Sequence, residues 1–398
     1  MIKKMLDGNG AVAEAIKLAE VSVISAYPIT PQSPISEKLS EMVENRELDA
    51  KYIRVESEHS ALSCAIGAQL SGVRACTATA SVGLALMFEV LGVASGCRVP
   101  LVMPVVNRAL VSPWSLWCDH QDSMAARDTG WMQFYLENAQ EVFDFMLIAY
   151  KIAEDSDVMT PAMVCLDGFF LSHSMQTVST LTLEEVKKFL PDYKAKNMFF
   201  DFDNPMIINN LTPPEEFSEM RLQQEIGFDN ALTLLPEILV EFNELYSKNY
   251  DIVENYRCDD ADAIIVAMGS MTGTIKHVVN EMRKNGKKVG LLKIILFRPF
   301  PFKRISSEIN SSCSVGVIDR SAGLGAQQGP VFLEVNAALS GRENLYGFIA
   351  GLGGRDITEK TIEGIFEKLL DNPDSIEKEW IDTNKDVFDL RKKTVVQK

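Results

Sequence analysis

The sequence predicts an α/β protein, with a doubly wound parallel-sheet domain followed by a smaller α/β domain. Three observations support this prediction. Apolar runs of strand length alternate with segments of helix length along most of the chain, and the runs are continuously apolar. Such strands are typical of parallel sheets that are covered by helices on both faces. The length of 398 residues also exceeds that of most single domains.

The first part of the chain contains the longest alternating series. A helix is expected at 10–20 with Asn9 as its cap, then a strand at 21–25. Ser33 followed by Pro34 predicts a helix start, because serine caps helices and proline suits the first helical position. The series continues with strand 52–55, helix 59–71, strand 73–79, helix 82–94, strand 101–106, a loop to about 130, helix 139–154 and strand 162–166.

The alternation stops between about 172 and 260, where Asn, Pro, Phe and acidic residues are frequent and one helix, 231–246, is expected. It then resumes with strands 263–268, 289–295, 315–318 and 345–349, helices 272–285, 331–339 and 358–370, and a proline-rich corner at RPFPF. We therefore predict a first domain at 1–230, a linker helix at 231–260 and a second domain at 261–398.

Composition excludes several functional classes. The net charge of −16 argues against nucleic acid or an anionic membrane as a partner. No segment resembles a signal peptide or a membrane span. The seven cysteines include no C-x-x-C pair, so neither a disulfide framework nor a zinc or iron–sulfur site is expected. With histidines few and dispersed, no metal site is predicted on this chain. A cytoplasmic location is expected.

Glu58 lies where a predicted strand gives way to a helix. Together with Glu56 it could simply complement the helix dipole, which contributes roughly 0.3–1 kcal/mol and implies no chemistry. The helix that follows is unusually rich in small residues, so another backbone or subunit could approach it closely. The next strand ends in Thr79-Ala80-Ser81. Loops at the carboxyl ends of parallel strands are where ligands bind in open α/β sheets.

Two further loops are rich in polar and aromatic side chains. The first, 25–34, carries Tyr27 and Thr30 on a backbone stiffened by prolines. The second, 107–131, carries Arg108 and the run DHQD at 119–122. The simplest interpretation of Arg108 is a surface ion pair, and that of DHQD is a solvated turn. The density of large polar groups nevertheless exceeds what a connection requires.

Ordered motifs along nearly the whole chain carry a family resemblance. They are AYPITPQSPISE (26–37), ESEHSA (56–61), TATASVGLALM (77–87), NRAL (107–110), DHQDSMAARDTGW (119–131), DGFFLSH (167–173), AMGS (267–270), LFRPFP (296–301) and VIDRS (317–321). In these motifs the chain resembles the α subunit of pyruvate:ferredoxin oxidoreductases, within the 2-oxoacid:ferredoxin oxidoreductase family. The resemblance implies a thiamine-diphosphate-binding domain of the pyrimidine type, followed by a transketolase-C-terminal-like domain.

The resemblance also implies roles for individual residues. Glu58 matches the glutamate that hydrogen-bonds to the cofactor's pyrimidine ring and assists catalysis. Arg108 matches the residue that binds the substrate carboxylate, and Thr30 matches its hydroxyl partner. The neighbouring Tyr27, Pro28 and Ile29 are expected to contact the cofactor.

The sequence lacks the Gly-Asp-Gly…Asn pattern that holds Mg²⁺ and the diphosphate, as well as cluster-binding cysteines. By resemblance, a β subunit supplies the Mg²⁺ and diphosphate site and a [4Fe–4S] cluster, a δ subunit supplies ferredoxin-like clusters, and a γ subunit completes the complex. The implied reaction converts pyruvate and coenzyme A to acetyl-CoA and CO2, with ferredoxin as electron acceptor. Another 2-oxoacid (branched-chain, 2-oxoglutarate or oxalate) and a non-catalytic scaffold role remain open alternatives. The bulky side chains of Trp114 and Trp117 affect how large a substrate the expected site could accept. Thr30 argues against oxalate as the substrate.

Overall fold

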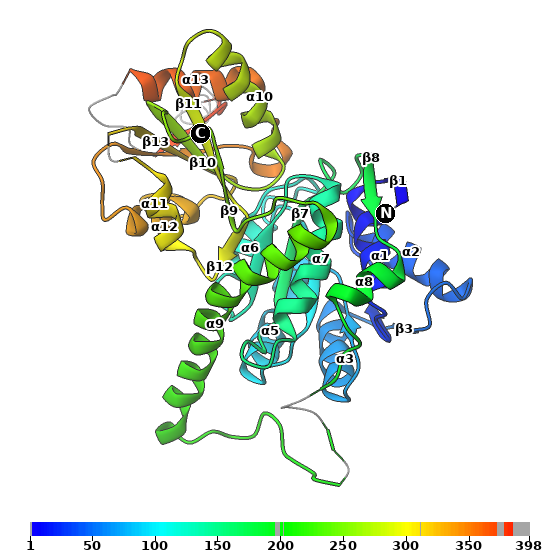
Figure 1. Ribbon diagram of the computed structural model, residues 1–398. Coiled ribbons are helices and arrows are strands. Elements are labelled where there is room, and N and C mark those ends of the chain that lie inside the picture. The colour runs from blue at the N-terminus through cyan, green and yellow to red at the C-terminus, as the bar shows by residue number, and fades with distance from the viewer. Residues whose placement is uncertain (1, 196–199, 202, 311, 372–377, 385–398) are drawn as a thin grey trace, which may run out of the picture.

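Two sheets organise the protein in the computed structural model, which describes residues 2–195, 200–201, 203–310, 312–371 and 378–384. Figure 1 shows most of the first sheet with its helices in blue to green, and the second sheet with its helices in yellow-green to red beside it. The predicted α/β class with parallel sheets is confirmed.

The first sheet is built from two hydrogen-bonded groups. One group has the order β3-β2-β4 and the other the order β12-β6-β7-β5, and a parallel bridge between Thr79 and Val105 joins them. All pairs are parallel except β12 with β6. The bounds are β2 (Val23–Ala26), β3 (Lys51–Arg54), β4 (Ala75–Cys76), β5 (Val102–Asn107), β6 (Met132–Tyr135), β7 (Ala162–Asp167) and β12 (Leu296–Arg298).

Helices pack on this sheet because their apolar residues cannot be buried otherwise. The most deeply buried is α7 (Ala139–Ala153), in which nearly every residue is enclosed. A helix that is apolar over most of its surface is expected to be buried in this way. The others are α1 (Gly8–Leu18), α2 (Ser33–Glu44), α3 (Glu58–Leu70), α4 (Ser81–Leu86), α5 (Phe88–Gly96) and α6 (Gln121–Ala125). An antiparallel ribbon of β1 (Ile2–Leu6) and β8 (Gln176–Thr180) lies at the edge.

The second sheet has the order β15-β14-β13-β10-β11-β9, in which only β9 is antiparallel to its neighbour. Its strands are β9 (Val253–Tyr256), β10 (Ala263–Ala267), β11 (Val289–Ile294), β13 (Ser314–Asp319), β14 (Leu345–Ile349) and β15 (Glu379–Trp380). Its helices are α10 (Met271–Lys284), α11 (Phe302–Glu308), α12 (Pro330–Ala338) and α13 (Glu359–Leu370). Among the described helices, none combines the length and the apolar composition that crossing a bilayer requires.

The two sheets are connected more closely than the sequence indicated. The proline-rich segment after β11 begins with β12, which pairs with β6 of the first sheet. Leu292 and Leu296, from β11 and β12, belong to the same buried cluster as the first domain's core. The boundaries drawn at 230 and 260 stay a prediction.

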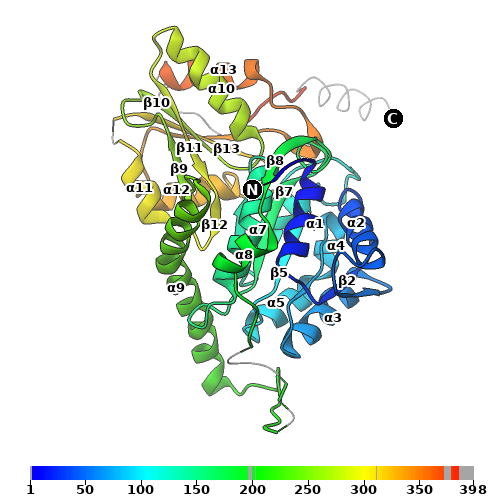
Figure 2. The ribbon, with the colours of Figure 1, turned by 45° about the vertical axis from the view of Figure 1, so that its right-hand side comes forward.

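The largest difference from the predicted elements is α9 (Pro214–Tyr246), which begins 17 residues before the expected 231. Figures 1 and 2 both show its N-terminal half projecting away from the body. The N-terminal half of α9 packs against few core residues, so its sequence has no continuous apolar stripe. Helices are recognised in a sequence by such a stripe, and this half was therefore not predicted. The prolines of this region favoured a non-helical connection in the sequence analysis. In the structure, Pro214 occupies the first turn of α9, where proline is tolerated.

Several smaller expectations were wrong at element ends. Asp7, not Asn9, caps α1, and Gln32, not Ser33, precedes α2. The strand expected at 73–79 is reduced to β4 plus a bridge, and the helix expected at 82–94 is divided at Met87. β3 is an exposed edge strand rather than a buried one. The elements that were not predicted are short or lie at edges: β1, β6, β8, β9, β12, β15, α6, α8 (Leu183–Phe189) and α11.

Candidate functional site

Glu58 is the first residue of α3 and its side chain is only 7% exposed. The helix starts here because the Ser57 side chain caps it, accepting a hydrogen bond from the Ser60 amide at 3.3 Å. Glu56, two residues earlier, is exposed and accepts a hydrogen bond from the Ser60 hydroxyl. The two acids therefore differ in environment: Glu56 faces solvent, and Glu58 faces the interior.

The turn between β4 and α4 covers the Glu58 side chain. A Cβ atom on Gly83 would lie 2.8 Å from Glu58 Oε1 and 2.5 Å from Thr79 Oγ1, so only glycine fits at this position. Thr79 Oγ1 is buried and has no hydrogen-bond partner in the described part of the chain. The Glu58 carboxylate likewise makes no ion pair or hydrogen bond with any described residue. A buried carboxylate beside a free hydroxyl is suited to bind a polar group of a ligand.

Arg108 follows β5 directly and is 5% exposed. Its Nη1 donates to the Thr30 carbonyl oxygen at 2.9 Å, and its Nε donates to the Ser115 carbonyl oxygen at 3.1 Å. Within the described residues no carboxylate forms an ion pair with it, which excludes the surface ion pair considered from the sequence. Burial lowers the pKa of Arg108, although Asp122 opposes this shift. A buried guanidinium without a counter-ion favours binding of an anion.

The loop after β2 brings the other candidate residues to the same edge of the sheet. Thr30 and Pro28 are exposed, whereas Tyr27 and Ile29 are half-buried. The Gln32 side chain accepts a hydrogen bond from the Ile29 amide at 3.3 Å. Arg108 contacts this loop directly, because its Nη1 donates a hydrogen bond to the Thr30 carbonyl oxygen. The roles of Tyr27, Pro28 and Ile29 stay a prediction.

The DHQD run is not a solvated turn. Asp119, His120 and Asp122 are all at most 2% exposed. Asp122 accepts hydrogen bonds from the backbone amides of Ser81 and Arg108, at 2.9 and 3.0 Å. Burial raises the pKa of Asp122 to about 6, against the opposing effect of the hydrogen bonds it accepts. Sequence reasoning missed this residue because a short polar run has no periodicity that would indicate burial.

A second buried cluster connects the two domains. Asp167, at the end of β7, contacts His120 Nε2 at 2.7 Å and Arg320 Nη1 at 2.7 Å, and accepts a hydrogen bond from the Ser270 amide at 3.0 Å. Burial alone would raise the pKa of Asp167, but Arg320 and His120 outweigh it and hold the pKa well below its usual range. The motifs DGFFLSH and VIDRS contain two members of this cluster, but their pairing could not be deduced from their positions.

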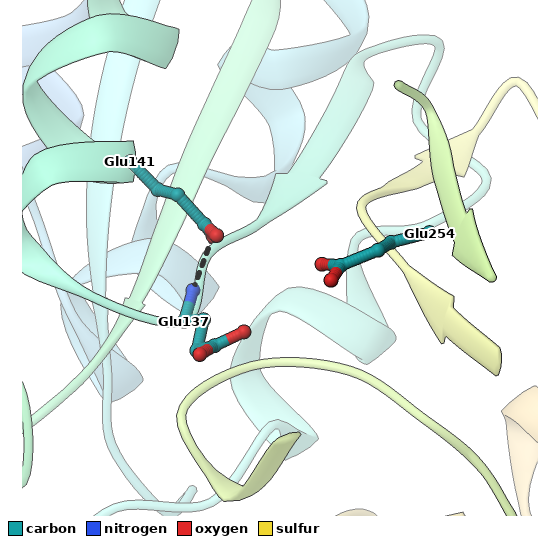
Figure 3. Close-up of side chains that lie close together, drawn as sticks. All are labelled: Glu137, Glu141 and Glu254. Carbon is teal, nitrogen blue, oxygen red and sulfur yellow. Dashed lines mark hydrogen bonds between the residues drawn. The ribbon is translucent and has the colours of Figure 1, made fainter. Parts of the chain in front are cut away.

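Three carboxylates at the domain junction lie close enough to hold a cation. Figure 3 shows Glu137 beside Glu141, with Glu254 pointing toward them from β9. Lysine ammonium groups already bind them: Lys293 Nζ lies 2.7 Å from Glu137 and 2.5 Å from Glu141, and Lys276 Nζ lies 2.8 Å from Glu137. The charge that a metal ion would neutralise is therefore largely neutralised by the chain itself.

Comparison with protein families matches most of the chain. Residues 14–238 match a family described as pyruvate flavodoxin/ferredoxin oxidoreductase, thiamine diphosphate-binding. Residues 261–362 match the pyruvate:ferredoxin oxidoreductase core domain II.

Several curated proteins are similar to this chain over nearly their whole length. Pyruvate synthase subunit PorA of Methanothermobacter thermautotrophicus is 46% identical over 94% of this chain and 97% of its own. The subunit of the same name from Thermotoga maritima is 43% identical over 91% and 93%. Ketoisovalerate oxidoreductase subunit VorA of Pyrococcus abyssi is also 43% identical, over 92% and 93%.

Two solved structures share the fold. A 2-oxoglutarate:ferredoxin oxidoreductase from Magnetococcus marinus, with 2-oxoglutarate, coenzyme A and succinyl-CoA bound, superposes with a TM-score of 0.74 at 20% identity. The match covers 92% of this chain, which spans 65% of the length of that chain. A split-gene transketolase superposes with a TM-score of 0.55 at 12% identity. Identities this low show a common fold only.

Proposed function

This chain belongs to the pyruvate flavodoxin/ferredoxin oxidoreductase family, and we propose that it is the alpha subunit of a pyruvate synthase. The complete enzyme would convert pyruvate and coenzyme A to acetyl-CoA and CO2 and transfer the electrons to ferredoxin. The structural observation that carries this proposal is the pair Glu58 and Arg108: two buried, oppositely charged side chains at one sheet edge, neither in an ion pair within the described chain.

Glu58 would bind the pyrimidine end of thiamine diphosphate. When bound, this cofactor supplies a carbon nucleophile that attacks the 2-oxo group and stabilises the charge left by CO2 loss. Glu58 can share a proton with a ring nitrogen, and its burial removes competing water. Gly83 lets the α4 backbone approach the Glu58 carboxylate closely, which fixes one side of it. The Thr79 hydroxyl, which has no partner among the described residues, offers a polar contact beside the carboxylate. Tyr27, Pro28 and Ile29 would contact the same cofactor from the loop after β2.

Arg108 would hold the carboxylate of pyruvate. Its Nη2 makes no hydrogen bond in the described structure, whereas Nη1 and Nε are oriented by carbonyl oxygens. A guanidinium held in this way presents its free edge in a defined direction, which suits recognition of a planar carboxylate. Thr30, exposed beside Nη1, would add a hydroxyl contact.

The chain would work only within a multi-subunit complex. A β subunit would supply Mg²⁺, the diphosphate site and a [4Fe–4S] cluster, and γ and δ subunits would complete the route to ferredoxin. The free thiols of all seven cysteines are consistent with a reducing, cytoplasmic setting.

A second candidate substrate is a branched-chain 2-oxoacid. It is favoured by the ketoisovalerate oxidoreductase relative, whose identity of 43% nearly equals that of the pyruvate synthases. An open pocket of about 700 Å³ lined by Trp117, Phe169 and Arg355 lies beside the loop that contacts Arg108, but Arg108 and Thr30 do not line it.

The experiment is to purify the native complex and measure viologen reduction with pyruvate, ketoisovalerate and 2-oxoglutarate, each with and without coenzyme A. Pyruvate synthase predicts the highest kcat/KM with pyruvate and strict dependence on coenzyme A. Preference for ketoisovalerate would support the second candidate. If the complex contains thiamine diphosphate but Glu58→Gln leaves its affinity and turnover unchanged, the chain is a scaffold.

A further inference from the structure

Asp122 is hydrogen-bonded to four donors from three separate segments. Its Oδ2 accepts the backbone N–H groups of Ser81 and Arg108, at 2.9 and 3.0 Å. Its Oδ1 accepts the Asn107 side-chain amide and the Ser123 backbone N–H, both at 2.8 Å. Only an ionised carboxylate can accept all four bonds at once. One oxygen therefore holds two segments that lie 27 residues apart in sequence.

The first of these segments lies against Glu58. Ser81 has a φ of +47°, a left-handed conformation that costs a non-glycine residue free energy and persists only where surrounding contacts impose it. Two contacts do so here: the Ser81 amide bonds to Asp122, and its hydroxyl donates to the Ala109 carbonyl at 2.5 Å. Two residues later, Gly83 lies directly on the Glu58 carboxylate. The position of Ser81 thus limits the space around Glu58.

The second segment carries Arg108. Its backbone N–H is held by Asp122 Oδ2, and its guanidinium extends to the Thr30 carbonyl oxygen. The same carboxylate oxygen therefore contacts the turn that borders Glu58 and the backbone of the residue proposed to bind pyruvate.

We propose that Asp122 is a positioning residue that fixes the cofactor-side turn at Ser81 and the substrate-side Arg108 relative to one another. The proposal rests on the proposed function, because it assigns these two segments to cofactor and substrate. Asp122 itself is proposed to contact neither the cofactor nor the substrate. It acts by holding the backbone from which the contacting side chains extend.

The second domain offers a matched control. Asp319 is 1% exposed, and its carboxylate accepts the backbone N–H groups of Val331 and Phe332 at 2.8 and 3.0 Å. Both donors belong to the first turn of α12, so this carboxylate caps a single helix and connects no part of the candidate site. Asp122 and Asp319 are alike in burial, and both accept hydrogen bonds from backbone N–H groups. Asp122 accepts four hydrogen bonds that join separate segments, whereas Asp319 accepts two from a single helix.

The test compares Asp122→Ala with Asp319→Ala in the reconstituted complex. The readouts are the Kd for thiamine diphosphate by calorimetry, the KM for pyruvate, and Tm. Both variants should lower Tm, since each leaves buried N–H groups without an acceptor. Only Asp122→Ala should weaken cofactor binding and raise the KM, each by about tenfold, the lower range for loss of a hydrogen bond to a charged group. If Asp122→Ala does not assemble, Asp122→Asn is measured in the same way.

A rescue variant separates the two sides. Ser81→Gly permits a positive φ without steric cost but also removes the hydroxyl bond to Ala109. In the Asp122→Ala background it should therefore restore only part of the cofactor affinity and leave the pyruvate KM raised. Cofactor Kd and KM at wild-type values in an assembled Asp122 variant would overturn the proposal. A wild-type complex without pyruvate turnover would contradict the proposed function instead, because Asp122→Ala would still alter cofactor affinity.

Discussion

The domain junction and the carboxyl edge of the first sheet both bury charged side chains, but at the edge Glu58 and Arg108 form no ion pair with any described residue. Lys293 is fully buried there and contacts Glu137 and Glu141 (Figure 3). Burial would lower the pKa of Lys293, but the surrounding carboxylates raise it. At the carboxyl edge, Glu58 and Arg108 are buried nearly as deeply and form no ion pair within the described residues.

This difference separates charges that are paired within the chain from those that we propose to bind cofactor and substrate. Burying a charge costs free energy unless a partner and hydrogen bonds compensate for it. At the junction, lysines of the chain itself largely neutralise the buried carboxylates, which suits a role in holding the domains together. At the edge, no described residue forms an ion pair with Glu58 or Arg108, which suits the proposed binding of a ligand there. Substitutions in the two regions should therefore affect different quantities.

The largest effect is expected at the junction. Lys293→Met keeps the length of the side chain but leaves Glu141 buried without its ammonium partner, which should destabilise the protein by about 3–5 kcal/mol. The measurement is the urea midpoint of unfolding. The double variant Lys293→Met/Glu141→Gln should recover much of this loss because it removes both charges together. A double variant as unstable as the single one would show that the pairing does not matter.

Glu58→Gln should affect activity rather than stability. The amide keeps the shape of the side chain but cannot share a proton with a ring nitrogen, so turnover should fall by at least ~10²-fold, the range for a general acid–base group. The urea midpoint of the variant should match that of the wild type or exceed it, because an unpaired buried charge is removed. Glu56→Gln, on the exposed side of the same turn, is the control and should retain activity. Damage by the Glu56 change alone would reverse the assignment.

Arg108→Lys tests the substrate side of the edge. Lysine keeps the charge but loses the planar guanidinium, so pyruvate binding should weaken by about 1.5–3 kcal/mol, the value of a charge-assisted hydrogen bond. Thr30→Val should raise the pyruvate KM less, because it removes a neutral hydroxyl contact. Bound thiamine diphosphate should stay constant in both variants. Loss of cofactor with an unchanged KM would make Arg108 a structural residue.

The smallest effect is expected for an exposed ion pair. Lys284 and Glu281 lie 2.6 Å apart on α10, and both are largely exposed. Lys284→Ala should change Tm by less than about 1 °C, because exposed pairs contribute little and alanine favours the helix. If Lys284→Ala lowered Tm as much as Lys293→Met does, then distance rather than burial would govern the strength of ion pairs in this protein.

Much of both sheets and their helices could be predicted from local pattern. Six strands are buried along their whole length, which is why their sequences are nearly continuously apolar. They are β5, β7, β10, β11, β13 and β14. Elements at edges or away from the core were missed or misplaced, as β12 and the outer half of α9 illustrate. Their positions depend on contacts with distant segments, to which a local hydrophobic pattern does not respond.

For the candidate site, the sequence by itself determined the residue types, their order and their location at the carboxyl ends of predicted strands. The family resemblance of its motifs then named Glu58, Arg108 and Thr30 as candidates, whereas position alone favoured a helix-dipole acid and a surface ion pair for the first two. Only the tertiary structure decided that Glu58 faces inward while Glu56 faces solvent, that no carboxylate among the described residues pairs with Arg108, and that Asp122 joins Ser81 to Arg108. The physical reason is that burial and pairing of a charge depend on which distant segments surround it. A carboxylate has the same formula in a solvated turn and in a buried network, and only the fold distinguishes the two.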